Sequence, residues 1–189
     1  MYTEKNYTHL LGIPGMSDTL LTNHFTLYSG YVKNTNTLRE RLKNLLEEDK
    51  TGPGEYAELK RRFGWEFSGM RLHELYFDAM TKEVKEIQSK TKELIEKNFG
   101  TVDNWKKDFI ATGSMRGIGW VLLVHDKTTN TLMNIWINEH DTGHLPGLTP
   151  LLVMDVFEHA YITDYQLKKT DYIQTYMNTI DWEVVEERI

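Results

Sequence analysis

The sequence predicts an α+β fold in which a helical half, residues 1–95, precedes a mixed α/β half, residues 96–189. Three observations predict it. Apolar residues recur at helical intervals through two long segments that a Gly- and Pro-containing turn separates. After Gly117 the pattern changes to short β-rich runs, and short helical segments complete the chain. We expect each half to form one domain.

The first helix is predicted to begin at Ser17, because serine caps helix N-termini by accepting a backbone hydrogen bond. The turn residues of Thr51–Gly54 follow it, and a second helical pattern extends through Met70 and Ile87. Two long helices joined by a short turn predict an antiparallel α-hairpin. The apolar face of the first helix contains leucines, tyrosines and one histidine: Leu20, Leu21, His24, Tyr28, Tyr31, Leu38, Leu42 and Leu45.

The second half is predicted to contain three β-strands among helices. Gly100 can end one helix and Thr101 can cap the next. The runs GWVLLVHD and TLMNIWIN flank a polar turn at residues 127–130 and predict a β-hairpin. LTPLLVMDV is a third β-like run, and EHAYITDYQ, TDYIQTYMNTI and WEVVEERI are typical of short helices.

Composition excludes several classes of function. The chain has 189 residues and a net charge of −6. Proteins that bind nucleic acid usually have an excess of basic residues, so a nucleic-acid partner is not predicted. It contains no cysteine, which excludes disulfides, thiolate metal sites and cysteine nucleophiles. No basic leader or membrane-length apolar segment is present. We therefore expect a soluble cytoplasmic protein whose metal sites, if any, use His, Asp or Glu.

The histidines are the main candidates for chemistry. His24 and His73 lie on apolar faces of the two predicted helices, so antiparallel pairing points both imidazoles into one interior. Asp155 precedes His159 by four residues at the end of the third β-like run, a spacing that lets both side chains reach one point. Singly, each has an ordinary alternative: histidines on apolar faces are usually hydrogen-bonded core residues, and Asp155 can cap a helix beginning at Phe157.

The remaining histidines predict less. His140 and His144 have the spacing of helical zinc ligands, but the intervening Asp-Thr-Gly and the following Leu-Pro-Gly disfavour a helix. His9 and His125 are interpreted as tail and turn residues without a role.

Over nearly its whole length the chain resembles the iron/manganese superoxide dismutase family. The most specific motif is Asp155-Val-Phe-Glu-His159-Ala-Tyr161, which is similar to the family signature DxWEHAxY with Phe157 at the Trp position. Four further matches occur in the same order as in the family. His24 and His73 match two ligand histidines, and Tyr31-Val32 matches a YV pair on the first helix. Gly119-Trp120 matches the GSGW segment, and residues 178–182 match the closing NxxxW pattern.

The resemblance implies an N-terminal α-hairpin followed by a three-stranded antiparallel sheet with helices. It also implies that His24, His73, Asp155 and His159 bind one Fe or Mn ion per chain, with a solvent molecule as fifth ligand. Iron is favoured, because His140 resembles the histidine of an iron-leaning subset of the family. Zinc could occupy such a site without performing the reaction, because it is redox-inert.

The implied activity is that of an antioxidant oxidoreductase, which converts two superoxide ions to oxygen and hydrogen peroxide. In this comparison Tyr31 is the gateway tyrosine, and Trp120 belongs to the site through its GSGW-like segment. His140 is the residue that hydrogen-bonds the metal-bound solvent, with His144 as the alternative. Some family members use a glutamine for this purpose at the position of Gly69.

The resemblance further implies a homodimer, with a tetramer as the alternative. Glu158 would reach across the interface to His159 of the partner subunit, where a carboxylate fixes the imidazole tautomer and raises its basicity. Lys169 lies where the family often has an arginine that could steer an anion, and a solvated surface role is the alternative.

The chain departs from the family at several positions. His24 precedes Tyr31 by seven residues where the family has eight, so a regular helix is expected between them. Tyr28 replaces a histidine, Ile162 replaces its tyrosine partner, and Leu122 replaces a tryptophan. We expect Tyr28 to lie toward the subunit boundary, with its ring near Ile162 and its hydroxyl bonded to water or to another polar group. Tyr28→Phe would then be nearly harmless.

These departures keep two other hypotheses open. One is a metal-binding relative without fast turnover, used for storage or sensing. The other is a metal-free helical interaction module.

Overall fold

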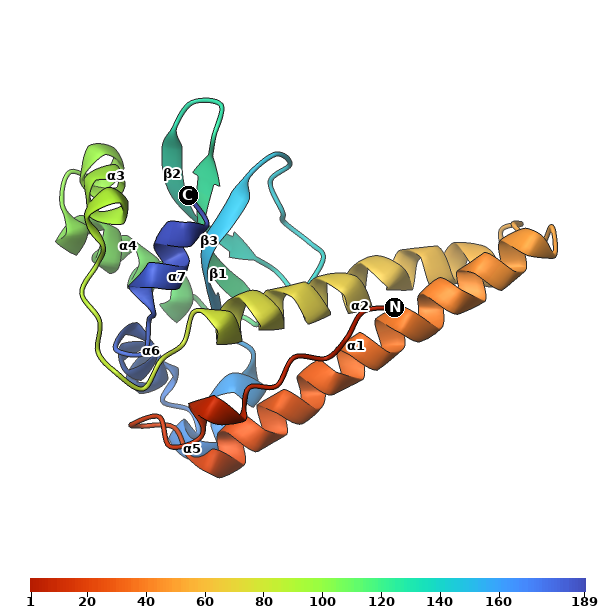
Figure 1. Ribbon diagram of the computed structural model, residues 1–189, viewed down its shortest axis with the longest axis horizontal. Coiled ribbons are helices and arrows are strands. Elements are labelled where there is room, and N and C mark those ends of the chain that lie inside the picture. The colour runs from red at the N-terminus through yellow and green to blue at the C-terminus, as the bar shows by residue number, and fades with distance from the viewer.

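The N-terminal part of the chain is a long α-hairpin that extends beyond the rest of the molecule (Figure 1). The computed structural model describes all of residues 1–189. Helix α1 spans Asp18–Glu47 and helix α2 spans Glu55–Asp78, and the two pack against each other. The Ser17 hydroxyl accepts a hydrogen bond from the Leu20 amide at 3.1 Å, which confirms the predicted helix start.

Helix α2 ends earlier than its sequence pattern predicts. The apolar pattern continues to Ile87, but the helix stops at Asp78 and residues 79–88 are not helical. The chain turns there to pair with a distant segment: Met80 forms an isolated antiparallel bridge with Ile180, and the Thr81 amide donates to the Thr179 carbonyl at 2.7 Å. Tertiary pairing therefore replaces the last predicted turns of helix.

The second half is an α/β lobe built on a three-stranded antiparallel sheet. Two helices, α3 (Ser89–Phe99) and α4 (Val102–Ser114), precede strands β1 (Trp120–Asp126), β2 (Thr131–Ile137) and β3 (Thr149–Asp155). The strand order is β2-β1-β3, and both pairs are antiparallel. This confirms the predicted fold class. The division into domains 1–95 and 96–189 stays a prediction.

Short helices close the chain after β3. They are the 3-10 helix η2 (Glu158–Ala160) and helices α5 (Ile162–Tyr165), α6 (Lys169–Met177) and α7 (Trp182–Glu187). None of the helices has the length and apolarity needed to cross a membrane.

The core joins the two parts of the chain. Strand β1 is central in the sheet, and its residues from Trp120 to His125 are buried. Helix α2 packs against β3, and α1 packs against η2. The half-buried Arg188 side chain donates to the carbonyls of Leu151 on β3 and Leu75 on α2, at 2.7 and 3.0 Å. Strand β3 therefore lies against α2, and its last residue, Asp155, meets His24 on α1 (Figure 1).

Candidate metal centre

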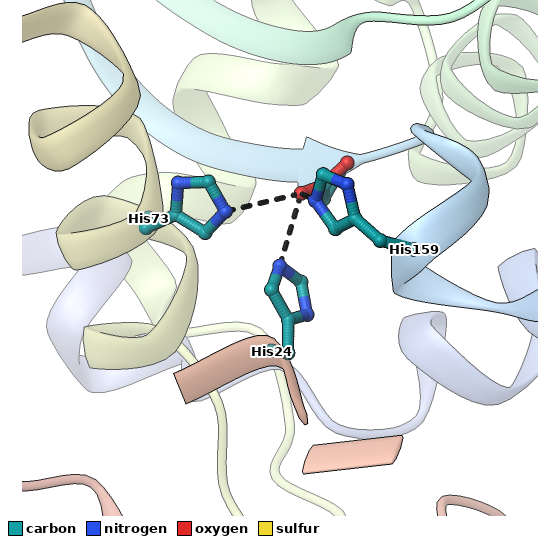
Figure 2. A group of neighbouring side chains, drawn as sticks. His24, His73 and His159 are labelled. Atoms are coloured by element: carbon teal, nitrogen blue, oxygen red, sulfur yellow. Dashed lines mark hydrogen bonds and ion pairs between the residues drawn. The ribbon is translucent and has the colours of Figure 1, made fainter. Parts of the chain in front are cut away.

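Four potential ligands from four segments converge where β3 ends. The ligand atoms of His24 on α1, His73 on α2, Asp155 on β3 and His159 on η2 all lie within 4.8 Å of one another. Asp155 Oδ2 is 3.1 Å from His24 Nε2, 3.0 Å from His159 Nε2 and 3.7 Å from His73 Nε2. The three imidazoles point toward this carboxylate oxygen (Figure 2).

Helix α1 delivers His24 to this point without any irregularity. The helix is α-helical throughout Asp18–Glu47, so no bulge separates His24 from Tyr31. Seven residues span nearly two turns, which places both side chains on the inner face. The expectation of a regular helix between them is confirmed.

His73 presents a free nitrogen lone pair to the centre. Its Nδ1–H donates to the Gly69 carbonyl at 2.6 Å, one turn earlier on α2, which leaves Nε2 unprotonated in the neutral ring. Nε2 is buried and has no hydrogen-bond partner. A buried polar atom without a partner costs about 1–3 kcal/mol, and a bound cation would remove that cost. The residues present therefore fit a metal ion.

The ionised Asp155 and the neutral His24 and His73 also suit a cation, whereas His159 favours its charged form while no metal is bound. Burial opposes the charge on Asp155, but the charge of His159 and the hydrogen bonds from His159 and His24 outweigh burial and hold the pKa of Asp155 well below its usual range. Burial lowers the pKa of His24 and lowers that of His73 further. Burial opposes a charge on His159 too, but Asp155 raises its pKa overall. Neutral imidazoles and an ionised carboxylate are the forms that bind metals.

The metal-free protein should lose stability as the pH falls from 7 to 5. The folded-state pKa values of His24 and His73 are lowered, so the unfolded chain binds protons in this range that the folded chain does not. His159 acts in the opposite direction, since its raised pKa contributes stability that is present below pH 6.5 and lost as pH rises. The lowered groups outnumber the raised one, because burial also lowers the pKa of His140, and we expect a net loss of stability.

Thermal unfolding of the metal-free protein in a pH series measures this loss. A midpoint that stays level or rises between pH 7 and 5 would contradict the protonation states described above.

Tyr31 and His140 form a hydrogen-bonded pair beside the centre. The Tyr31 hydroxyl lies 2.7 Å from His140 Nε2, and Trp120 Nε1–H donates to His140 Nδ1 at 3.0 Å. Burial lowers the pKa of His140 to about 4, so its ring is neutral and carries its one proton on Nε2. His140 therefore donates to the Tyr31 oxygen. The hydroxyl proton of Tyr31 remains free for another acceptor.

The position of Tyr31 depends on a glycine. The Tyr31 ring stacks on the His73 ring with centroids 5.1 Å apart, and it covers Gly69. A Cβ atom at residue 69 would lie 2.7 Å from Tyr31 Cδ1, so any side chain there would force the Tyr31 ring to shift. Burial raises the pKa of Tyr31 to about 12, with contributions from Asp155 and Glu66, so the hydroxyl stays protonated.

The loop between β2 and β3 selects His140 rather than His144. Glu139 adopts φ 59°, and Asn138 forms a bridge with Thr142, so this segment is a tight turn and not a helix. His140 is buried and reaches Tyr31. The exposed His144 instead bonds the His140 carbonyl through Nε2 at 2.8 Å. From the sequence, either histidine remained a candidate for the hydrogen bond to a metal-bound solvent molecule.

The remaining residues that the sequence analysis singled out do not contact the Tyr31–His140 pair. Glu158 is exposed on η2. Lys169 donates to the Met115 carbonyl, and its ammonium lies 5.7 Å from the centroid of the Trp136 ring. Its ammonium is therefore held by contacts within the chain. His9 is exposed, as a tail residue would be. His125 is not a turn residue, because it is buried within β1, where its Nε2 lies 2.9 Å from Asn130 Oδ1.

The expected position of Tyr28 at a subunit boundary is wrong, whereas its hydroxyl does bond another polar group as expected. Tyr28 is buried within the chain, where its hydroxyl donates to Glu74 Oε1 and accepts from the Lys5 amide, both at 3.1 Å. Its ring packs on Tyr7 with centroids 5.6 Å apart. The reason is that the N-terminal segment runs along the hairpin and covers this face of α1 (Figure 1). Ile162 is 44% exposed.

Glu74 is a buried charged residue that the sequence interpretation missed. Its second oxygen pairs with the Arg71 guanidinium, one turn earlier on α2. An acid directly after His73 on an apolar helix face, with an arginine three residues before it, was the available signal.

Tyr28→Phe should therefore destabilise the protein. The change removes one hydrogen bond from the buried Glu74 carboxylate and one from the Lys5 amide, which costs about 1–3 kcal/mol. Denaturant unfolding measures the change in the free energy of unfolding, with Tyr56→Phe as control because Tyr56 is half-exposed. Equal stability of the two variants would show that the Tyr28 hydroxyl contributes nothing.

Comparison with known proteins gives consistent matches. Residues 87–188 match the family model described as iron/manganese superoxide dismutases, C-terminal domain. A manganese superoxide dismutase of Haloferax volcanii is 34% identical over 172 residues, which cover 90% of this chain and 85% of that protein. An iron superoxide dismutase of Aquifex pyrophilus is 34% identical over 190 residues, which cover 97% of this chain and 89% of the relative. An iron superoxide dismutase of Saccharolobus solfataricus is 29% identical over 182 residues, which cover 93% of this chain and 86% of the relative.

Proposed function

Because the chain belongs to the iron/manganese superoxide dismutase family and is a superoxide dismutase, we propose that one Fe or Mn ion is held by His24, His73, Asp155 and His159. The observation that carries this assignment is the convergence of four ligand atoms within 4.8 Å. The unpaired Nε2 of His73 supports it. When bound, the ion supplies one-electron redox chemistry, by which two superoxide ions and two protons become oxygen and hydrogen peroxide.

The ligand set suits an anionic substrate. Three neutral imidazoles and one carboxylate contribute a single negative charge, so a divalent or trivalent ion keeps a net positive charge. Asp155 is fully buried and bonded to two of the imidazoles, which fixes its orientation. The surrounding aromatic rings exclude bulk water and strengthen the electrostatic attraction.

Tyr31 and His140 are proposed to hold a proton for the reaction. His140 donates to the Tyr31 oxygen, so the Tyr31 hydroxyl proton is available to a substrate at the centre. Trp120 acts as a positioning residue, because its indole N–H fixes the His140 tautomer.

Iron is proposed as the preferred metal on the resemblance of His140 to the histidine of iron-leaning family members. The relatives include enzymes named for iron and for manganese at equal identity. Reconstitution of the metal-free protein with each metal, followed by a superoxide assay, decides between them. A cytoplasmic location stays a prediction.

A homodimer is proposed from the surroundings of His159. Its Nε2 faces Asp155, its side chain is 24% exposed, and Glu158 beside it is exposed. Glu158 would bond the free Nδ1 of His159 of the partner subunit, which would fix the tautomer that binds metal. Light scattering at micromolar concentration should show a dimer or a tetramer. A fully active stable monomer would refute this proposal.

Metal analysis and a superoxide assay on the same preparation test the metal assignment. We expect one Fe or Mn per chain together with rapid turnover. Stoichiometric metal without turnover would favour the storage or sensing hypothesis. A folded protein that binds neither ion would contradict the proposed site.

A further inference from the structure

A layer of side chains on α2 lies over the Tyr31–His140 pair, and the metal centre does not use it. The Trp65 ring meets the His140 ring edge-on, with centroids 4.6 Å apart at 66°. The Arg62 guanidinium lies over the same indole, 5.2 Å from its centroid. Arg62, Trp65 and His140 therefore contact one another in a row that leads from the surface to the Tyr31–His140 pair.

Arg62 is held in place although its side chain is 55% exposed. Glu66 Oε1 accepts hydrogen bonds from Arg62 Nε at 2.8 Å and lies 2.6 Å from Nη2. Glu66 is buried, and its other oxygen accepts from Asn34 Nδ2 at 3.2 Å. Asn34 lies one turn after Tyr31 on α1, so these bonds fix the guanidinium relative to Tyr31.

The charges at this point would repel an anion without Arg62. Glu66 and Asp141 are both carboxylates that act on the pair: Glu66 on Tyr31 and Asp141 on His140. Asp141 also faces α2, since a Cβ atom on Gly64 would lie 3.6 Å from its Oδ2. The charge of Arg62 is felt at both Tyr31 and His140. Glu66 and Asp141 carry two negative charges, and the positive charge of Arg62 reduces their net charge to −1.

We propose that Arg62 is the steering residue that allows an anionic substrate to approach the Tyr31–His140 pair. The guanidinium offsets one of the two carboxylate charges of Glu66 and Asp141, and its contact with the Trp65 ring keeps it beside the Tyr31–His140 pair. Lys169 lies elsewhere, where its ammonium bonds the Met115 carbonyl and faces the Trp136 ring. The inference rests on the proposed function, since it concerns access to the same centre.

Arg61 provides a matched control. It neighbours Arg62 on α2, its side chain is 70% exposed, and it pairs with Glu58 at the surface. Arg61→Gln and Arg62→Gln remove the same charge from the same helix. The Debye length is about 30 Å at an ionic strength of about 0.01 M. Under that condition Arg62→Gln should lower kcat/KM for superoxide roughly three- to tenfold. Arg61→Gln should lower it clearly less.

Salt and a double variant separate steering from a structural role. At an ionic strength of about 0.5 M the difference between Arg62→Gln and the unchanged protein should largely vanish, because salt screens exposed charges. The double variant Arg62→Gln with Glu66→Gln restores the local charge and should recover most of the lost rate at low salt. A loss that persists at high salt and in the double variant would overturn steering, as would equal effects of Arg61→Gln and Arg62→Gln.

Azide binding gives a measurement that does not depend on turnover. The metal-loaded protein is titrated with azide, a small monovalent anion, and the apparent Kd is followed by absorbance at low and high salt. Arg62→Gln should weaken azide binding at low salt and Arg61→Gln should not. Absent turnover in the unchanged protein would overturn the proposed function alone, whereas unchanged azide affinity in Arg62→Gln would overturn the role of Arg62.

Discussion

His159→Ala is expected to leave a folded protein that no longer holds one ion per chain. The change removes one of three imidazoles from the centre and deprives Asp155 Oδ2 of its 3.0 Å partner. His159 is the most exposed of the four groups, so its truncation opens no enclosed cavity. Residues that merely support metal ligands cost 10–100-fold when removed, so loss of a ligand should reduce activity by more than about 100-fold.

Metal content by elemental analysis and superoxide turnover measure this effect on one preparation. His9→Ala is the control, because His9 is exposed on the N-terminal 3-10 helix Thr8–Leu10. It should retain metal and turnover. Circular dichroism checks that both variants fold. Undiminished metal content in His159→Ala would sink the ligand assignment.

His140→Ala is expected to keep its metal and lose about 10–100-fold in activity. The change removes the donor to the Tyr31 oxygen and leaves the Trp120 indole N–H without its acceptor. The four proposed ligands keep their own contacts, because none of them bonds His140. Activity per bound ion, rather than metal content, should therefore fall.

His144→Ala is the matched control for that result. His144 lies in the same loop and bonds only the His140 carbonyl, so its loss should change activity by less than about threefold. His140→Gln should recover part of the rate, since a glutamine amide can also donate to the Tyr31 oxygen. Wild-type behaviour of His140→Ala together with failure of His144→Ala would assign the role to His144.

The fold followed from the sequence wherever local periodicity decides structure. The caps at Ser17 and Thr101, the two long helices and the strand runs all have patterns that a few neighbouring residues determine. The end of α2 did not follow, because the pairing of Met80 with Ile180 depends on a segment distant in the chain.

The site shows the same division. Helix faces and a four-residue spacing made His24, His73, Asp155 and His159 candidates, and the resemblance to the family joined them into one ligand set. Only the tertiary structure decided that His140 meets Tyr31, because that contact depends on a turn at Glu139 without periodicity.

Tyr28 marks the limit most clearly. Its place on α1 was evident from the sequence, but its partners Lys5 and Glu74 come from the N-terminal segment and from α2. The sequence determined which residue types and helix faces this protein brings inward, because those depend on neighbours a few positions away. The tertiary structure decided which polar groups meet there, because hydrogen bonds between distant segments form only after the segments pack.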